Sequence, residues 1–155
     1  MEQLIAEVSQ VEGVAVEDIH TVALDRPDQS VLALDTAARI MESPRDERLE
    51  ATCELVREML ESDWCTIMRR DTAIPLAVSG DVPDLPWVIA FLAGTTHLAG
   101  DAAHEHTPAD IAWAPLDLLD AVIVIGRIRG AFRLRERQHV TLIARIVSSA
   151  FVGFD

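Results

Sequence analysis

Apolar residues follow two different periods along the first part of the chain. Residues 2–11 place them at helical spacing, and a β-like run over residues 14–22 follows. An acidic stretch with a proline then breaks the pattern. We therefore predict an αβ unit over residues 1–26 and a boundary before a second unit over residues 28–155. A lone helix and strand cannot bury enough apolar surface by itself, so the first unit is expected to pack against something else.

Two helices are predicted at the start of the second unit. The first runs from Ser30 to about Met41, and its expected buried face is Leu34, Ala37, Ala38 and Met41. Ser43 followed by Pro44 is a typical helix start, with a capping hydroxyl and a proline at the first helical position. The second helix points its apolar side chains inward at Leu49, Cys53, Val56, Met59 and Leu60.

The rest of the chain predicts four strands and a closing helix. The strands cover residues 64–69, 73–78, 111–116 and 121–128, and the helix covers about residues 135–151. The expected inward face of this helix is Val140, Ile143, Val147 and Ala150. Pro75 favours an edge position for the second strand, because proline cannot donate a ladder hydrogen bond. The fourth strand is apolar on both faces and belongs in the middle of the sheet. The fold class is therefore α+β, an antiparallel sheet packed with helices.

A helix and a long polar segment lie between the second and third strands. The helix begins at Asp84 and carries Trp87, Val88, Phe91 and Leu92 on one face. Residues 94–110 are small, polar and rich in histidine, without a clear period. A loop of this length is uncommon in a compact domain, and this one is a candidate for covering a ligand.

Composition excludes several function classes. The chain has 26 acidic and 13 basic side chains, a formal net charge of −13, and no lysine, asparagine or tyrosine. This acidity argues against a nucleic-acid partner. The absent residues remove Schiff-base, P-loop-lysine and tyrosine chemistry. No apolar run approaches eighteen residues and the N-terminus is acidic, so we expect no membrane partner, no signal peptide and a cytoplasmic location.

The charge is unevenly spread along the chain. Residues 1–65 carry sixteen acids and five arginines, whereas residues 126–155 carry two acids and six arginines. One interpretation is an acidic, soluble surface with one arginine-bearing hairpin. The other is that the arginines meet an acidic partner such as the acidic helices of a second copy. These arginines include Arg127, Arg129, Arg133, Arg135 and Arg137.

Cysteines and histidines offer little chemistry. Cys53 and Cys65 form no CxxC pair and are expected to be buried, reduced thiols. His97, His104 and His106 lie within ten residues, but no second ligand pair accompanies them, so we expect a solvated loop, no metal and no cofactor. Haem ligation by one of these histidines stays open.

The order of elements, with its residues, resembles the GAF family of small-molecule sensory domains. The resemblance covers about residues 30–152. It is carried by the helix over residues 50–60 that leads into Trp64-Cys65-Thr66-Ile67-Met68. At the far end it is carried by Ala114-Pro115-Leu116, the hydrophobic strand from Ala121 to Gly126, Phe132 and the closing helix. It implies a GAF-like α+β fold with a regulatory role.

Residues 2–24 resemble the last helix and strand of an ACT domain. The step Val11-Glu12-Gly13-Val14 carries this likeness. It implies a shortened ACT-plus-GAF-like regulator, a combination associated with actinobacteria. The alternative is an N-terminal extension that adds to the GAF-like sheet or to a partner's sheet.

The best-defined activities of the GAF family lack their residues in this chain. The cyclic-nucleotide signature needs asparagine and lysine, and bilin attachment and methionine sulfoxide reduction need cysteines beyond Cys65. We therefore expect no enzymatic activity. The resemblance places a ligand pocket between the sheet and the segment from Asp84 to Trp113. The residues around it would be Trp87, Phe91, His97, His104, Trp113 and Arg127. The alternative for both tryptophans is plain core packing.

Two functions follow as hypotheses. The first is a non-catalytic regulatory or sensory domain that binds a small metabolite, such as an amino acid or another small acid, and forms a homodimer. The second is a ligand-free dimerisation module of a larger signalling or transcription-regulating system.

Overall fold

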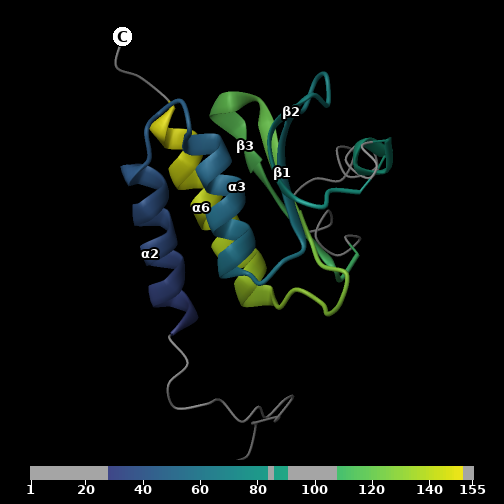
Figure 1. Ribbon diagram of the computed structural model, residues 1–155, viewed down its shortest axis with the longest axis horizontal. Coiled ribbons are helices and arrows are strands. Elements are labelled where there is room, and N and C mark those ends of the chain that lie inside the picture. Colours follow the sequence, from purple (N-terminus) through teal and green to yellow (C-terminus); the bar gives the residue numbers. More distant parts are fainter. Residues whose placement is uncertain (1–27, 84–85, 91–107, 152–155) are drawn as a thin grey trace, which may run out of the picture.

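The computed structural model describes residues 28–83, 86–90 and 108–151, in which helices pack on one face of an antiparallel sheet (Figure 1). The helices are α2 (Gln29–Glu42), α3 (Arg48–Met59) and α6 (Leu134–Ala150). The strands are β1 (Trp64–Arg69), β2 (Pro75–Gly80), β3 (Ile111–Leu116) and β4 (Ala121–Gly126). A 3-10 turn, η1 (Asp117–Leu119), joins β3 to β4. The predicted α+β class is confirmed.

The sheet has the strand order β2-β1-β4-β3, and each neighbouring pair is antiparallel. Every residue of β4 is buried, which confirms its predicted place in the middle of the sheet. The edge position of β2 is confirmed as well, and its pairing with β1 shifts register beside Pro75, where the ladder loses a donor. β2 begins two residues later than predicted, and β4 ends at Gly126 instead of residue 128.

The two central strands bury both of their faces. Ile67 of β1 and Ile123 of β4 point toward the helices and join the larger core cluster. Met68 and Val124 point to the opposite face and join a second cluster that includes Val88 from the short helix over residues 86–90. Successive strand residues face opposite sides, so burial on both faces requires an unbroken apolar run.

β4 ends in a close contact that only glycine permits. A Cβ on Gly126 would collide with the indole ring of Trp64, its pairing partner on β1. The backbone therefore comes close to the ring, and the chain leaves the sheet at the next residue, Arg127.

The buried face of α2 differs from the prediction. The inward residues are Ala33, Thr36, Ala37 and Ile40, so Ala37 alone of the predicted set is buried. Leu34 is 71% exposed and Met41 is 38% exposed. Small side chains at Ala33 and Ala37 let α2 lie close to α3 and α6, which it contacts together. Larger apolar residues remain on its outer face.

The predicted helix start at Ser43 was also wrong. Asp28 caps α2, its carboxylate accepting a hydrogen bond from the amide of Ser30 (2.7 Å). Ser43 ends that helix, where its own amide and hydroxyl donate to the carbonyl of Arg39. The next helix begins at Arg48, after a turn. The predicted inward faces of α3 and α6 are confirmed by the burial of Cys53, Val56, Val140, Ile143 and Val147.

Some predictions lie outside the described residues. These include the αβ unit over residues 1–26 and the histidine-rich segment up to residue 107. Among the helices that the structure describes, none combines the length and apolarity needed to cross a bilayer.

Candidate functional site

The residues predicted to line a ligand pocket fall on two sides of the sheet. Trp113 is half-buried in β3 and packs against the second core cluster. Trp87 lies in the short helix that contributes Val88 to that cluster, and it is 46% exposed. Arg127 follows β4 and instead lines a cavity beside the ends of the helices. The positions of Phe91, His97 and His104 lie outside the described residues.

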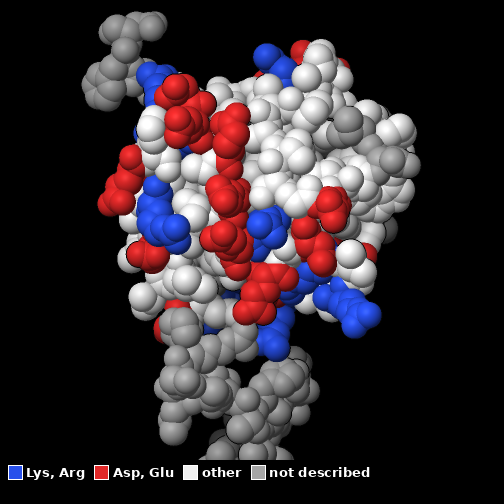
Figure 2. All heavy atoms as spheres, in the orientation of Figure 1, with Lys and Arg blue, Asp and Glu red and all other residues white. Residues whose placement is uncertain are grey.

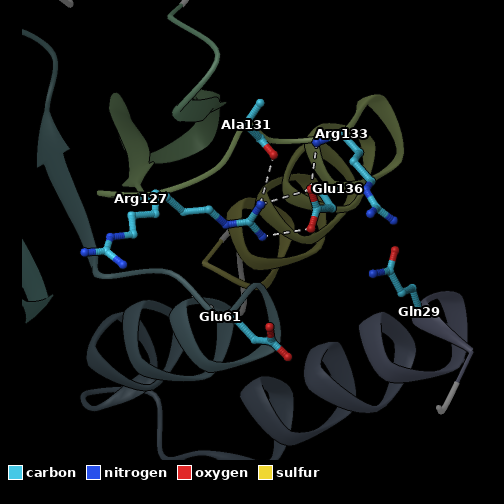
Figure 3. Close-up of a pocket in the computed structure, with 7 residues that line it drawn as sticks. Gln29, Glu61, Arg127, Ala131, Arg133 and Glu136 are labelled. Carbon is cyan, nitrogen blue, oxygen red and sulfur yellow. Dashed lines mark hydrogen bonds and ion pairs between the residues drawn. The ribbon is translucent and has the colours of Figure 1, made fainter. Parts of the chain in front are cut away.

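The cavity beside Arg127 has a volume of about 250 Å³ and opens between four parts of the chain (Figure 3). These are the first turn of α2, the second residue after α3, the turn between β4 and α6, and the start of α6. The lining residues are Gln29, Glu61, Arg127, Arg129, Ala131, Arg133 and Glu136. Because α2 and α6 both start here, their N-terminal ends meet at one site (Figures 1 and 3).

Arg127 and Glu136 form a buried ion pair at the back of this cavity. Nη2 of Arg127 lies 2.8 Å from Oε1 of Glu136, and Nη1 lies 3.3 Å from Oε2. The side chains are 13% and 9% exposed. The same guanidinium donates to the carbonyls of Leu60 and Ala131 and lies 4.2 Å from the ring centre of Phe132. These contacts connect α3, the β4–α6 turn and α6. They also engage the guanidinium of Arg127, which we predicted from the sequence to bind a ligand.

The surroundings of Glu136 favour its ionised form. Burial by itself raises the pKa of this carboxyl. The hydrogen bonds from Arg127 and from the amide of Arg133 (2.7 Å), together with the charges of both arginines, outweigh burial and hold the pKa of Glu136 below its ordinary value. The amide of Arg133 is the N-cap amide of α6, so Glu136 also closes the start of that helix.

Four polar side chains of the cavity remain outside this ion pair. Figure 3 shows the guanidinium of Arg133 and the amide of Gln29 facing each other, while Glu61 enters from the end of α3. Arg129 lines the same cavity, and neither Arg129 nor Arg133 forms an ion pair within the described part of the chain. Glu61 is held in a left-handed backbone conformation with a φ of 50°.

A smaller cavity of about 150 Å³ adjoins the first and shares four of its residues, Gln29, Glu61, Arg127 and Glu136. Its remaining lining is apolar and comes from Leu32, Met59 and Leu60. The two cavities thus form one recess with a charged mouth and an apolar side.

The wider surface around the recess is strongly acidic. Figure 2 shows a stripe of acidic side chains along α3, with arginines gathered at its lower end over the β4–α6 turn. The exposed acids of this helix and the residues that flank it are Glu47, Glu50, Glu54, Glu58 and Glu61. The recess is therefore a local concentration of cations in an otherwise acidic region.

Both cysteines lie in the core between helix and sheet. Cys53 and Cys65 are completely buried, free thiols. Burial raises the pKa of the Cys65 thiol well above its ordinary value, and the hydrogen-bonded Cys53 adds to the effect. A thiol in this state is a poor nucleophile.

The described part of the chain contains no candidate metal-binding site. No cluster of three or more histidine, cysteine, aspartate or glutamate side chains occurs among the described residues. His139 lies on the buried side of α6, and the other histidines lie outside the described ranges.

The recess was not expected from the sequence. Gln29, Glu61, Arg133 and Glu136 were missing from the predicted site. One local signal points to Glu136, because a glutamate three residues after an N-cap is typical of a capping box. No local signal indicates that the far ends of two helices meet there.

Comparisons with known proteins identify the fold. No protein-family model matches the chain, and no curated protein matches it. The chain is similar to the crystal structure of the GAF domain from Acinetobacter phosphoenolpyruvate-protein phosphotransferase, with a TM-score of 0.57 and 15% sequence identity. The match covers 82% of this chain and 98% of that one. At this identity the likeness establishes a GAF-like fold, which confirms that part of the resemblance inferred from the sequence.

Proposed function

We propose that this chain is a non-catalytic regulatory domain that binds a small metabolite on the sheet face opposite the helices. The observation that carries the proposal is the pair of tryptophans on that face. Trp113 is half-buried against the second core cluster, and Trp87 presents 46% of its surface. Accessible aromatic rings beside an apolar cluster are typical walls of a small-molecule site.

The state of the reactive side chains supports a role without catalysis. The buried thiol of Cys65 has a raised pKa, which keeps it protonated at neutral pH. Glu136 and Arg127 are engaged with each other and with the backbone. These groups stabilise the fold and are poorly placed for chemistry on a substrate. An ACT-like unit over residues 1–26 would suit the same regulatory role and stays a prediction.

Thermal-shift screening of the full chain tests ligand binding. Amino acids and other small acids are the first compounds to screen, and a ligand raises the melting temperature in proportion to the logarithm of its concentration. We expect Trp87→Ala to abolish the response. Ile89→Ala is the matched control, because Ile89 lies in the same short helix and is 40% exposed. No response to any compound, or an equal loss in both variants, would contradict the proposal.

A second candidate function is self-association through the outer face of α2. Val31 and Leu34 are 63% and 71% exposed, and Met41 is 38% exposed, although all three are large apolar residues. They recur along one side of the helix and form an apolar stripe. A stripe of this kind is self-complementary under two-fold symmetry, so a second copy of the chain is the proposed partner.

Light scattering of the purified chain at micromolar concentration tests self-association. We expect the mass of a dimer for the unmodified protein and of a monomer for Leu34→Glu. Ile74→Glu is the control, since Ile74 is 56% exposed but lies in the turn before β2. A monomeric unmodified protein would refute this candidate and leave the ligand proposal standing.

A further inference from the structure

The recess at the N-terminal ends of α2 and α6 holds more positive charge than its own carboxylates neutralise. Three arginines and two glutamates line the larger cavity. Arg127 and Glu136 neutralise each other at 2.8 Å. Among the described lining residues, Glu61 is then the remaining carboxylate beside Arg129 and Arg133, and the charge of Arg133 also acts on Glu136. This excess of cations occurs in a chain with a net charge of −13, and neither Arg129 nor Arg133 forms an ion pair with another described residue.

The N-terminal ends of two helices also lie at this recess, each already capped by a carboxylate. Gln29 is the first residue of α2, and Arg133 is the N-cap residue of α6. A helix N-terminus acts as about half a positive charge within its first turn. The carboxylates of Asp28 and Glu136 already accept hydrogen bonds from amides at these two starts, so the positive charge available to an anion comes from the arginines of the recess. The guanidinium of Arg133 lines the larger cavity and faces the Gln29 amide (Figure 3).

The apolar side of the recess restricts the kind of anion. Leu32, Met59 and Leu60 line the smaller cavity, and both cavities share Gln29 and Glu61. Taken singly, the two cavities have volumes of about 250 and 150 Å³, each smaller than the roughly 300–1,000 Å³ that is typical of sites for drug-sized ligands. The recess therefore fits a small molecule with one charged end and one short apolar end.

We propose that this recess binds a small organic anion. Its carboxylate or phosphate would lie against Arg133, with a short apolar chain directed toward Leu32 and Met59. This site is separate from the tryptophan face, on the other side of the sheet. Its existence does not depend on the ligand proposal made for that face, and the two are tested with different variants.

The composition of the chain supplies a selective probe. Because there is no asparagine, side-chain amide signals in a ¹H–¹⁵N spectrum come only from glutamine, at positions 3, 10, 29 and 138. Gln29 lines both cavities, whereas Gln138 is exposed on α6 and lines neither. Titration of the ¹⁵N-labelled full chain should shift the Gln29 amide in a saturable way and leave the Gln138 amide in place.

The titrations use acetate, butyrate, hexanoate and butyl phosphate, with inorganic phosphate as a head-group probe. Affinity should rise from acetate to butyrate by about fourfold for each methylene that becomes buried. Comparing butyrate with butyl phosphate identifies the preferred head group. If inorganic phosphate binds as tightly as butyl phosphate and acetate as tightly as hexanoate, the apolar half of the proposal is wrong.

Two arginine substitutions distinguish anion binding in this recess from nonspecific attraction of anions to any surface arginine. Arg133→Met should weaken binding at least tenfold and keep α6 intact, because the hydrogen bond to Glu136 comes from the backbone amide of residue 133. Arg145→Met is the matched control, an exposed arginine on the same helix that lines neither cavity. Circular dichroism checks that both variants fold. No saturable Gln29 shift, an equal shift at Gln138, or equal affinities of the two variants would overturn the proposal.

Discussion

Replacing Arg127 with methionine should destabilise the protein more than any exposed arginine substitution does. At about 3 Å and an effective dielectric constant of about 20, two unit charges attract by roughly 5 kcal/mol, part of which the loss of hydration offsets. The substitution leaves the carboxylate of Glu136, whose side chain is 9% exposed, without its ion-pair partner. It also removes the donor to the carbonyls of Leu60 and Ala131. A loss of about 3–5 kcal/mol is expected.

Urea unfolding followed by circular dichroism measures this loss. The midpoint for Arg127→Met should fall by at least about 1 M without a change in slope. Arg145→Met should stay within about 0.5 kcal/mol of the unmodified protein, as surface substitutions usually do. The double variant Arg127→Met with Glu136→Gln should regain at least about 1 kcal/mol, because it removes the unpaired charge and keeps an acceptor for the N-cap amide. If Arg127→Met behaves like Arg145→Met, the ion pair does not hold the fold as argued.

The same ion pair predicts a pH dependence. The pKa of Glu136 is lowered in the folded state, so its stabilising contribution is fully present above the pKa of an unfolded glutamate, about 4.3. The contribution is lost as the pH falls through the lower folded-state pKa. The difference in unfolding free energy between the unmodified protein and Glu136→Gln should therefore shrink between about pH 6 and pH 3. A difference that stays constant or grows toward acid would contradict this assignment.

Three further results are expected. Gly126→Ala should lower the free energy of unfolding by about 1–3 kcal/mol in urea titration, because its Cβ would collide with the ring of Trp64, and an unchanged midpoint would refute that contact. Ala73→Gly should raise the free energy of unfolding by about 0.5–1 kcal/mol, because Ala73 has a φ of 53°, which glycine adopts more easily. As a control, Ala38→Gly within α2 should lower the free energy of unfolding by about 1 kcal/mol. The two buried thiols should resist a thiol-specific dye until the protein is unfolded, and rapid labelling of the native protein would show that the core opens readily.

Local patterns accounted for the elements and the sheet. A strand that is buried on both faces must be apolar at every position, and the run over residues 121–126 has this property, so its central place was predictable. Pro75 indicated an edge for a similarly local reason. The buried faces of α3 and α6 followed from helical spacing, although α6 also exposes Leu142 and Ile146.

The helix α2 shows the limit of that reasoning. It carries two neighbouring apolar stripes, one with Ala33 and Ala37, the other with Val31 and Leu34. Spacing alone ranks the stripe with larger side chains as the inner one. The structure buries the smaller residues because α2 lies across both α3 and α6, and close approach of three helices favours small side chains.

The candidate sites were likewise only partly predictable from local sequence. The sequence by itself determined which residue types were present, and thereby removed lysine, asparagine and tyrosine chemistry and pointed to Arg127 as an anion ligand. Only the tertiary structure decided that Arg127 is engaged by Glu136, nine residues later, and by the carbonyl of Leu60, 67 residues earlier. It likewise decided that the starts of α2 and α6 enclose one recess. The physical reason is that hydrophobic periodicity is a property of neighbours in the chain, whereas ion pairing and cavity shape depend on segments that meet only when the helices pack.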